Sequence, residues 1–600
     1  MIVALVVDAI RGSSAERESS LLFGSGEMSK VGTIFDESVV DPFAVAGAKI
    51  QPSFQEEDTP SRLREGVAER CAAHAGPYDH GIPCTSLGIP VLNRGRHHKW
   101  LATIAPMLAL ISFDAVSRPL LDRMIAQDRL PNCAALLRSG KTYSMETSPI
   151  HASVYRSLYT GFSLSTHGVY YPLLWSASEQ RVRAVEPLHP EHSVFARLDR
   201  AGRRMLVIDP PECGWFEPRH GIALSGWQCT TRFVTPEWYS SNRIARALKH
   251  QFGPPKSCHE VFGRPDMPRL RAMHDVLRSA PRRLADATVA CLREGEFDCV
   301  WATFVAAHIA GHQLWYESLH PKRDADGREP EVLAGIYQKA DEALGRMLAA
   351  FPRQTAVIVC SPNGMGPETS RADFLPAMLA RVLAGRASNR TTAGSSLWRL
   401  RAIAPTALRA RVADAIPDQL VPRLTAYLEN VGVDRRTARA FALPSDGPGF
   451  VRLNLKGRER HGIVDPRDAP ALLDEISAGL RTFIEPSGEN MIASIVRSAD
   501  LDVPGPKSPL LPDLVIVWSP TPDAALRVVT SPRFGDVARD GVGSGRSGNH
   551  CDGSWACVVP GGSGRLAPDV EPVRVIDLAA TVCAVMEVPH DDLPGRSLLQ

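Results

Sequence analysis

An aspartate that follows an apolar run is one residue of this chain that could take part in chemistry. The run from Leu108 to Phe113 is short and almost entirely apolar, which predicts a buried strand, and Asp114 comes directly after it. In open α/β sheets, ligands bind beyond the carboxyl ends of the strands. We therefore expect Asp114 to lie at a functional edge of the sheet.

The elements that must position this aspartate can be predicted from the residues that follow it. Helices are expected over residues 120–130 and 133–138, and a turn at residues 148–153 leads into a further short helix. Two glycine-containing pairs come next, Thr160-Gly161 and His167-Gly168. This segment therefore combines a buried strand, an acidic residue at its end, helices and a turn, which is an arrangement typical of an active site.

Strands and helices alternate along most of the chain beyond residue 101. Further strands are expected at residues 204–209, 299–306, 354–361 and 512–518, and the long helices at residues 268–294 and 332–351. Such alternation predicts a parallel sheet with helices on both faces, to which the strand at 512–518 is expected to return. The pattern changes between about residues 385 and 501, where an inserted cap is expected.

The composition indicates an ordinary globular protein and excludes some partners. The chain has 600 residues, 44% of them hydrophobic and 22% charged, and 68 basic against 66 acidic residues give a formal net charge of +2. This balance predicts neither a nucleic-acid partner nor an anionic membrane partner. A small-molecule substrate is the expected partner, and the oligomeric state is not predicted.

The cysteines and the apolar runs suggest a location. The twelve cysteines form no CxxC pair, which favours buried thiols in a reducing compartment over a disulfide framework. The first residues, MIVALVVDAIRG, are apolar but lack a basic segment, and no apolar run is long enough to span a membrane. We therefore expect a soluble, cytoplasmic protein with a loosely ordered extension over residues 1–100.

The motifs around Asp114 resemble those of the type I phosphodiesterase and nucleotide pyrophosphatase branch of the alkaline phosphatase superfamily. That branch shows a strand ending in Asp, a nucleophile at a helix start, then Thr-Gly and His-Gly. The resemblance covers roughly residues 105–600 and includes the segment Asn454 to Glu459. It implies an α/β fold with a central, mostly parallel sheet, a core over residues 101–385 and 506–600, and an inserted cap subdomain over residues 386–505.

The resemblance also implies a metal site, in which two ions are held by three Asp and three His. At one site the matching positions are His308, His312 and His550, so a family Asp has become His308. At the other site Asp114 remains, but the Asp-His pair has become Pro362-Asn363. The nucleophile position falls on His151. The second site thus lacks most of its metal ligands.

The residues that remain still form a coherent set. Three imidazoles with an open fourth position are a known catalytic zinc arrangement, and replacing a carboxylate by neutral His makes the ion a stronger Lewis acid. Asp114 is then a fourth ligand, an acceptor that orients a histidine, or a general base. His151 is a base, a ligand or a nucleophile, and Ser153 is an alternative nucleophile.

Three further residues are candidates for substrate contact. Asn363 is either a turn residue that faces the substrate or a weak ligand, while Asn454 and Arg458 lie in the cap segment. An arginine can bind phosphate or carboxylate through two parallel hydrogen bonds. A solvated loop is the competing interpretation of these cap residues.

Two hypotheses about function follow from these residues. The first is a metal-dependent hydrolase with one zinc ion that acts on a small phosphorus or sulfur ester; a non-haem iron site ranks below it. The second is a pseudoenzyme that keeps the fold as a binding or scaffold module. The replacement of two metal ligands by Pro362-Asn363 favours the pseudoenzyme, because loss of ligands is expected when an active site decays. The exchange of Asp for another good ligand, His308, favours an active site with altered metal binding.

Overall fold

A computed structural model describes residues 107–600 of the chain. The description leaves out residues 261–262, 316–330, 386–411, 413, 432–434, 523–525, 540–543 and 569. The expected extension over residues 1–100 lies outside the described residues, as does part of the expected cap. No helix of the described residues has the length and apolar character that crossing a membrane requires.

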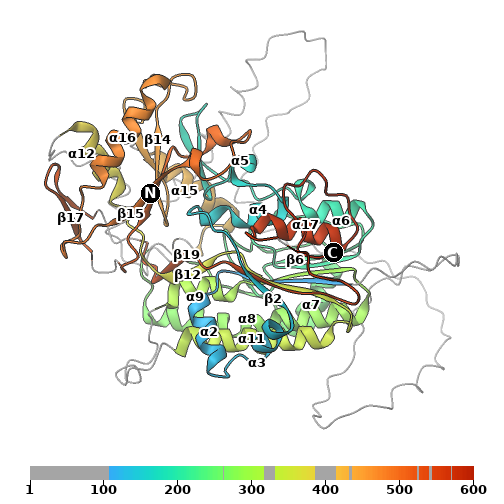
Figure 1. Cartoon of the computed structure of the whole chain (residues 1–600). Helices are drawn as coiled ribbons and strands as arrows, with labels where there is room; N and C mark the ends of the chain where they lie inside the picture. The colour runs from blue at the N-terminus through green and yellow to red at the C-terminus, as the bar shows by residue number, and fades with distance from the viewer. Residues whose placement is uncertain are drawn as a thin grey trace, which may run out of the picture. The chain divides into compact units, whose positions relative to one another are not determined.

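A sheet of eight strands forms the centre of the described structure (Figure 1). Five neighbouring strands run parallel, with β1 between β11 and β10, then β5 and β6. At the edges β8 pairs antiparallel with β6, and β20 pairs antiparallel with both β11 and β2. Their bounds are β1 Leu108–Phe113, β2 Lys141–Ser144, β5 Met205–Ile208, β6 Gly221–Ser225, β8 Trp238–Tyr239, β10 Cys299–Phe304, β11 Ala356–Ser361 and β20 Trp555–Val559. The expected mostly parallel sheet is confirmed.

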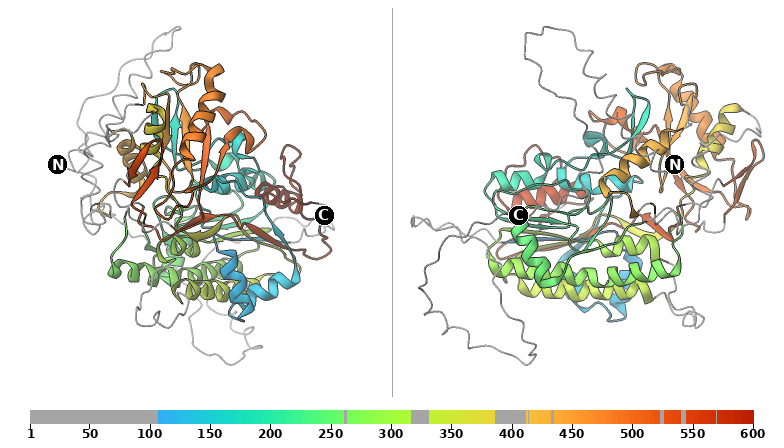
Figure 2. Two further views of the ribbon diagram at one scale, coloured as in Figure 1. Left: turned by 60° about the vertical axis from the view of Figure 1, so that its left-hand side comes forward. Right: turned by 180° about the vertical axis from the view of Figure 1, so that it is seen from behind.

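Helices cover both faces of this sheet. One face carries α2 Arg118–Ala126, α3 Pro131–Ser139, α8 Met267–Glu294 and α11 Glu331–Ala350, and the views of Figures 1 and 2 agree that α8 and α11 run side by side. The other face carries α4 Val154–Thr160, α6 Val194–Arg200 and α17 Val575–Val585. The fold class predicted from the alternation of strands and helices is therefore confirmed.

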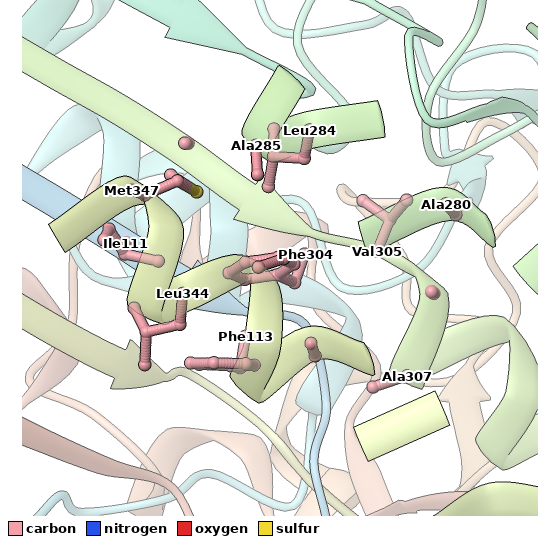
Figure 3. Packing of buried hydrophobic residues seen from close by; sticks show 14 of the residues in the cluster. Ile111, Phe113, Ala280, Leu284, Ala285, Phe304, Val305, Ala307, Leu344 and Met347 are labelled. Atoms are coloured by element: carbon pink, nitrogen blue, oxygen red, sulfur yellow. The ribbon is translucent and has the colours of Figure 1, made fainter. Parts of the chain in front are cut away.

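The side chains of β1 show why an almost entirely apolar strand is needed at the centre. Ile111 and Phe113 belong to the hydrophobic cluster under α8 and α11, whereas Leu108 and Leu110 belong to the cluster under α4 and α17. Successive side chains of a strand point to opposite faces, so a strand buried on both sides is apolar almost throughout, and in β1 the one polar residue, Ser112, is also buried. In Figure 3 Phe113 lies against Phe304 of β10, with ring centroids 4.8 Å apart.

The longest helix begins and ends at recognisable signals. The side chain of Asp266 accepts a hydrogen bond of 3.0 Å from the amide of Arg269, which caps the N-terminus of α8, and Pro268 occupies the first turn. Gly295 follows the last helical residue. The structure thus agrees closely with the helix predicted over residues 268–294.

A second, smaller sheet combines three strands from the expected cap with a fourth, β16, from the segment after it. It has the order β13-β14-β16-β15, from Ala440–Leu443, Gly449–Leu453, Leu514–Trp518 and Ile492–Arg497, and it packs on α12 Leu375–Ala384 and α16 Ala469–Leu480 (Figure 1). The prediction that the strand at 512–518 returns to the main sheet is wrong, because β16 pairs with β14 and β15. A buried apolar run predicts a central strand but does not reveal which sheet holds it.

Candidate metal centre

The end of β1 and the start of a short helix meet at the carboxyl edge of the main sheet. Phe113 of β1 is in register with Phe304 of β10, and the helix α9, Ala306–Leu314, begins directly after β10. The amide of Asp114 donates to the carbonyl of Phe304 at 3.0 Å. This register brings the Asp114 carboxylate, which is fully buried, to His308 in the first turn of α9.

His308 and His312 lie one helical turn apart and each uses Nδ1 for a fixed hydrogen bond. His308 Nδ1 is 2.6 Å from Asp114 Oδ2, and His312 Nδ1 is 2.9 Å from the carbonyl oxygen of Gly548. Residues four apart share one face of a helix, so both rings point to the same side. Because Nδ1–H donates in each case, Nε2 is the nitrogen left to bind a ligand.

The third histidine comes from a two-stranded ribbon. β19, Gly548–Cys551, pairs antiparallel with β12, Gly364–Pro367, and His550 stands opposite Met365. Its ring centroid lies 4.8 Å from that of His308 and 4.9 Å from that of His312, and the His308 and His312 centroids are 4.7 Å apart. The three rings therefore form a nearly equilateral triangle.

The donor atoms of this triangle fit a metal ion. One nitrogen from each ring lies within 4.8 Å of the others. Within the described part of the chain, His312 Nε2 and His550 Nδ1 are buried and have no hydrogen-bond partner. Buried polar atoms are nearly always satisfied, so two unpartnered nitrogens in one cluster indicate a missing partner. Three imidazoles with an open position suit zinc.

The electrostatics favour neutral imidazoles at two of the three positions. Burial lowers the pKa of His312 well below its usual value, and Arg546 and the neighbouring histidines lower it further. Burial and the charges of His308 and His151 do the same to the pKa of His550. The pKa of His308 is raised instead: burial opposes the charge, but the adjacent Asp114 carboxylate outweighs it.

The positions predicted to form a second site do not join this triangle. Of the described His, Cys, Asp and Glu residues, the only group of three or more with metal-ligand spacing is the histidine trio, so it includes neither Asp114 nor His151. His151 opens a short 3₁₀ turn and interacts electrostatically with His550 and with Asp552, whose charge partly offsets the lowering of the His151 pKa by burial.

Two other residues predicted to take part in the site, Asn363 and Ser153, have backbone or side-chain hydrogen bonds. The backbone oxygen of Asn363, between β11 and β12, accepts a hydrogen bond of 2.7 Å from Ser361 Oγ, which in turn accepts one from the amide of Val116. Ser153 Oγ donates to the carbonyl of Ile150 at 2.9 Å. Asn363 as a substrate contact and Ser153 as a nucleophile stay predictions, and the bond of Ser153 competes with a chemical role.

The two cap residues predicted to contact substrate form hydrogen bonds with other residues of the protein. Asn454 is fully buried; its amide nitrogen donates to the carbonyls of Arg436 and Ala438, and its oxygen accepts from Gln180. Arg458 binds Asp513 through two parallel hydrogen bonds of 2.7 Å each. These bonds give both side chains a structural role, so substrate contact stays a prediction without support from the geometry.

An ion-pair network near the histidines was not predicted from the sequence. Arg546 lies two residues before Gly548 and pairs with Glu260 at 2.7 Å and with Asp446 at 2.6 Å. Glu260 also accepts a hydrogen bond of 3.1 Å from Gln313, the neighbour of His312. The three charged residues come from loops far apart in the sequence, so no local spacing could have revealed them.

Glu212 is a second residue that the sequence analysis missed. It follows β5, the strand next to β10, and interacts electrostatically with both Asp114 and His308. Burial raises the pKa of Glu212 to about 7. Its backbone has φ of 59°, a conformation that L-residues rarely adopt and that clusters at functional sites. The rule that located Asp114, an acid shortly after a buried strand, could have located Glu212.

Comparison with known proteins places this chain in a family. The sequence model of the type I phosphodiesterase / nucleotide pyrophosphatase family matches residues 108–525, and the chain belongs to that family. The resemblance derived from the motifs is thereby confirmed. No curated protein matches the sequence.

Solved structures with a similar fold are distant in sequence. Phosphonoacetate hydrolase from Sinorhizobium meliloti 1021 is 14% identical, with a TM-score of 0.45 over 81% of this chain and 96% of that one. The alkaline phosphatase PafA is 11% identical, with a TM-score of 0.45 over 82% and 98%. Murine ectonucleotide pyrophosphatase / phosphodiesterase 5 is 10% identical, with a TM-score of 0.41 over 82% and 100%.

Proposed function

We propose that this protein is a hydrolase of a small phosphorus ester that holds one divalent ion, zinc, between His308, His312 and His550. The observation that carries the proposal is the triangle of imidazoles in which buried nitrogens of His312 and His550 lack partners. Zinc would supply Lewis acidity toward an ester oxygen. Membership of a metal-dependent phosphodiesterase family supports the same reaction class.

The protein's own residues would position the substrate and move a proton. His151 falls on the nucleophile position that the family resemblance implies, and the charge of Asp552 acts on its ring. We assign His151 the role of proton acceptor, which a neutral imidazole can perform near neutral pH. A sulfur ester as substrate and a cytoplasmic location stay predictions.

The alternative function is a binding module without catalysis. Pro362 provides no ligating side chain at a position where the family resemblance implies a metal ligand, which is what decay of a site produces. The alternative predicts that the histidine triangle binds no metal and that no ester is hydrolysed. The exchange of one good ligand for another at His308 speaks against it.

A substrate screen on the zinc-loaded protein tests the proposed function. The panel contains phosphomonoesters, phosphodiesters, phosphonates and sulfate esters, and the enzyme is compared with His308→Ala and with His220→Ala, a control at an exposed histidine. We expect zinc-dependent hydrolysis of at least one phosphorus ester, at least about 100-fold slower in His308→Ala and unchanged in His220→Ala. Zinc-loaded protein without activity toward the whole panel would contradict the hydrolase, and protein that also fails to bind zinc would support the binding module.

A further inference from the structure

We propose that Asp114 is a positioning residue that holds His308 through Nδ1 and is not itself a ligand of the metal. This inference rests on the proposed function, because it concerns the same zinc site. The family resemblance implies that Asp114 binds a second ion. The contacts of this chain give it a different role.

The first argument is the hydrogen bond between Asp114 Oδ2 and His308 Nδ1. Asp114 Oδ2 and His308 Nδ1 are 2.6 Å apart, and the carboxylate is fully buried. With Nδ1–H committed to this bond, the ring keeps one tautomer and Nε2 carries the lone pair. An oxygen that accepts this short hydrogen bond directs its electron density to the imidazole rather than to a metal ion.

The second argument is the spacing of the ligand atoms. The atoms of His308, His312 and His550 lie within 4.8 Å of one another, and across the described residues Asp114 is not part of that group. The positions that would complete a second site with Asp114 are Pro362 and Asn363, and a proline offers no side-chain ligand. Asp114 therefore lacks the partners that a second ion requires.

The third argument is the balance of charge. Replacing the family aspartate by His308 removes one negative charge from the ligands of the first ion. The Asp114 carboxylate restores one negative charge to the site, one imidazole ring away from the ion. A carboxylate bound to a ligating histidine also raises the basicity of that ring. His312, by contrast, has only the neutral carbonyl of Gly548 as its acceptor. His308 is thus the imidazole on which the carboxylate acts.

The second carboxylate oxygen of Asp114, Oδ1, affects the stability of the metal-free protein. Asp114 Oδ1 is buried and has no hydrogen-bond partner among the described residues. A buried carboxylate with one unsatisfied oxygen is costly, and a nearby cation offsets that cost. Removing the charge should weaken zinc binding, while its effect on the metal-free protein combines relief of that cost with loss of the charged bond to His308.

The experiment compares Asp114→Asn and Asp114→Ala with the wild type in zinc affinity, by chelator competition, and in zinc coordination, by X-ray absorption spectroscopy. Asn keeps an acceptor for Nδ1–H, and Ala does not. We expect affinity to fall about 10-fold in Asp114→Asn and about 100-fold in Asp114→Ala, with one zinc and three imidazoles still present in both variants. Thermal melting of the metal-free proteins should show a smaller loss of stability in Asp114→Asn, which keeps an acceptor for Nδ1–H, than in Asp114→Ala.

Asp209→Asn is the matched control, because Asp209 is also fully buried and also follows a parallel strand, β5, but accepts its hydrogen bonds from Trp227 and Gln228. Its zinc affinity should match that of the wild type. Loss of an oxygen ligand or of a second zinc in the Asp114 variants, or unchanged affinity in both, would overturn the positioning role alone. Failure of the wild-type protein to bind zinc would overturn the proposed function as well.

Discussion

Two buried polar clusters of this molecule differ in how completely their hydrogen bonds are made. The histidine triangle leaves His312 Nε2 and His550 Nδ1 without partners. The cap cluster, which we define as Arg452, Arg458, Glu459 and Asp513, binds itself: Glu459 Oε1 accepts from both arginines, at 2.8 Å and 3.0 Å. Both clusters contain residues that family motifs would offer as functional.

The difference between the clusters separates a structural role from a chemical one. A cluster whose donors and acceptors are all paired stabilises the fold and has no atom left for a ligand. A cluster with buried, unpartnered nitrogens carries a free-energy cost that a bound ion removes. We therefore expect substitutions in the cap cluster to lower stability, and substitutions in the triangle to lower metal affinity.

The largest expected effect is that of His312→Ala on zinc binding. Total zinc affinities of about 10–16 kcal/mol in structural sites, shared among the ligands, imply a loss of about 4 kcal/mol, or about a thousandfold in Kd. Chelator competition measures the loss. His167→Ala is the control, because both ring nitrogens of His167 are engaged, with Ser157 Oγ and the amide of Val169. A comparable loss of zinc in His167→Ala would remove the distinction between satisfied and unsatisfied histidines.

A smaller effect is expected when the cap cluster is broken. Glu459→Gln leaves the buried guanidinium of Arg452 without its countercharge, which should lower the free energy of unfolding by about 3 kcal/mol. Thermal melting measures the change, and zinc affinity should stay constant. Glu475→Gln, which breaks the half-exposed pair with Arg439, should cost less than about 1 kcal/mol. Equal melting temperatures for the two variants would contradict a structural role for the cap cluster.

The pH dependence of stability provides a third test, on His167. Burial lowers the pKa of this histidine to about 3, so the folded protein keeps it neutral while the unfolded chain protonates it below about 6.5. Stability should therefore fall as the pH decreases from about 6.5 toward 3, by about 2 kcal/mol at pH 5. Metal-free protein is used so that zinc release does not contribute. His167→Gln should be less sensitive to pH in this range, and an unchanged pH profile would show that His167 is not responsible.

The main sheet and the histidine triangle were within reach of sequence analysis because their signals are local. Apolar runs locate β1, β10 and β11, and the spacing of His308 and His312 places both on one face of a helix. Family motifs supply the third member, His550. The parallel register of β1 with β10 then brings Asp114 beside the first turn of α9.

The features that the sequence did not predict depend on residues that are distant from one another in the chain. An arginine suits an anion, which makes Arg458 a candidate for substrate contact, and that contact stays a prediction; in the structure Asp513, 55 residues further on, binds its guanidinium. The assignment of β16 to the smaller sheet and the Arg546 network have the same cause. Hydrophobic periodicity predicts that a segment is buried, and it does not say which buried partner it meets.

The measurement that tests the central claim most directly is the zinc content of the purified, reconstituted protein, determined by elemental mass spectrometry alongside His308→Ala. The histidine triangle predicts about one zinc per chain in the wild type and almost none in the variant. Two ions per chain would show that Asp114 and its neighbours still form a second site. No bound zinc after reconstitution would contradict the metal centre itself.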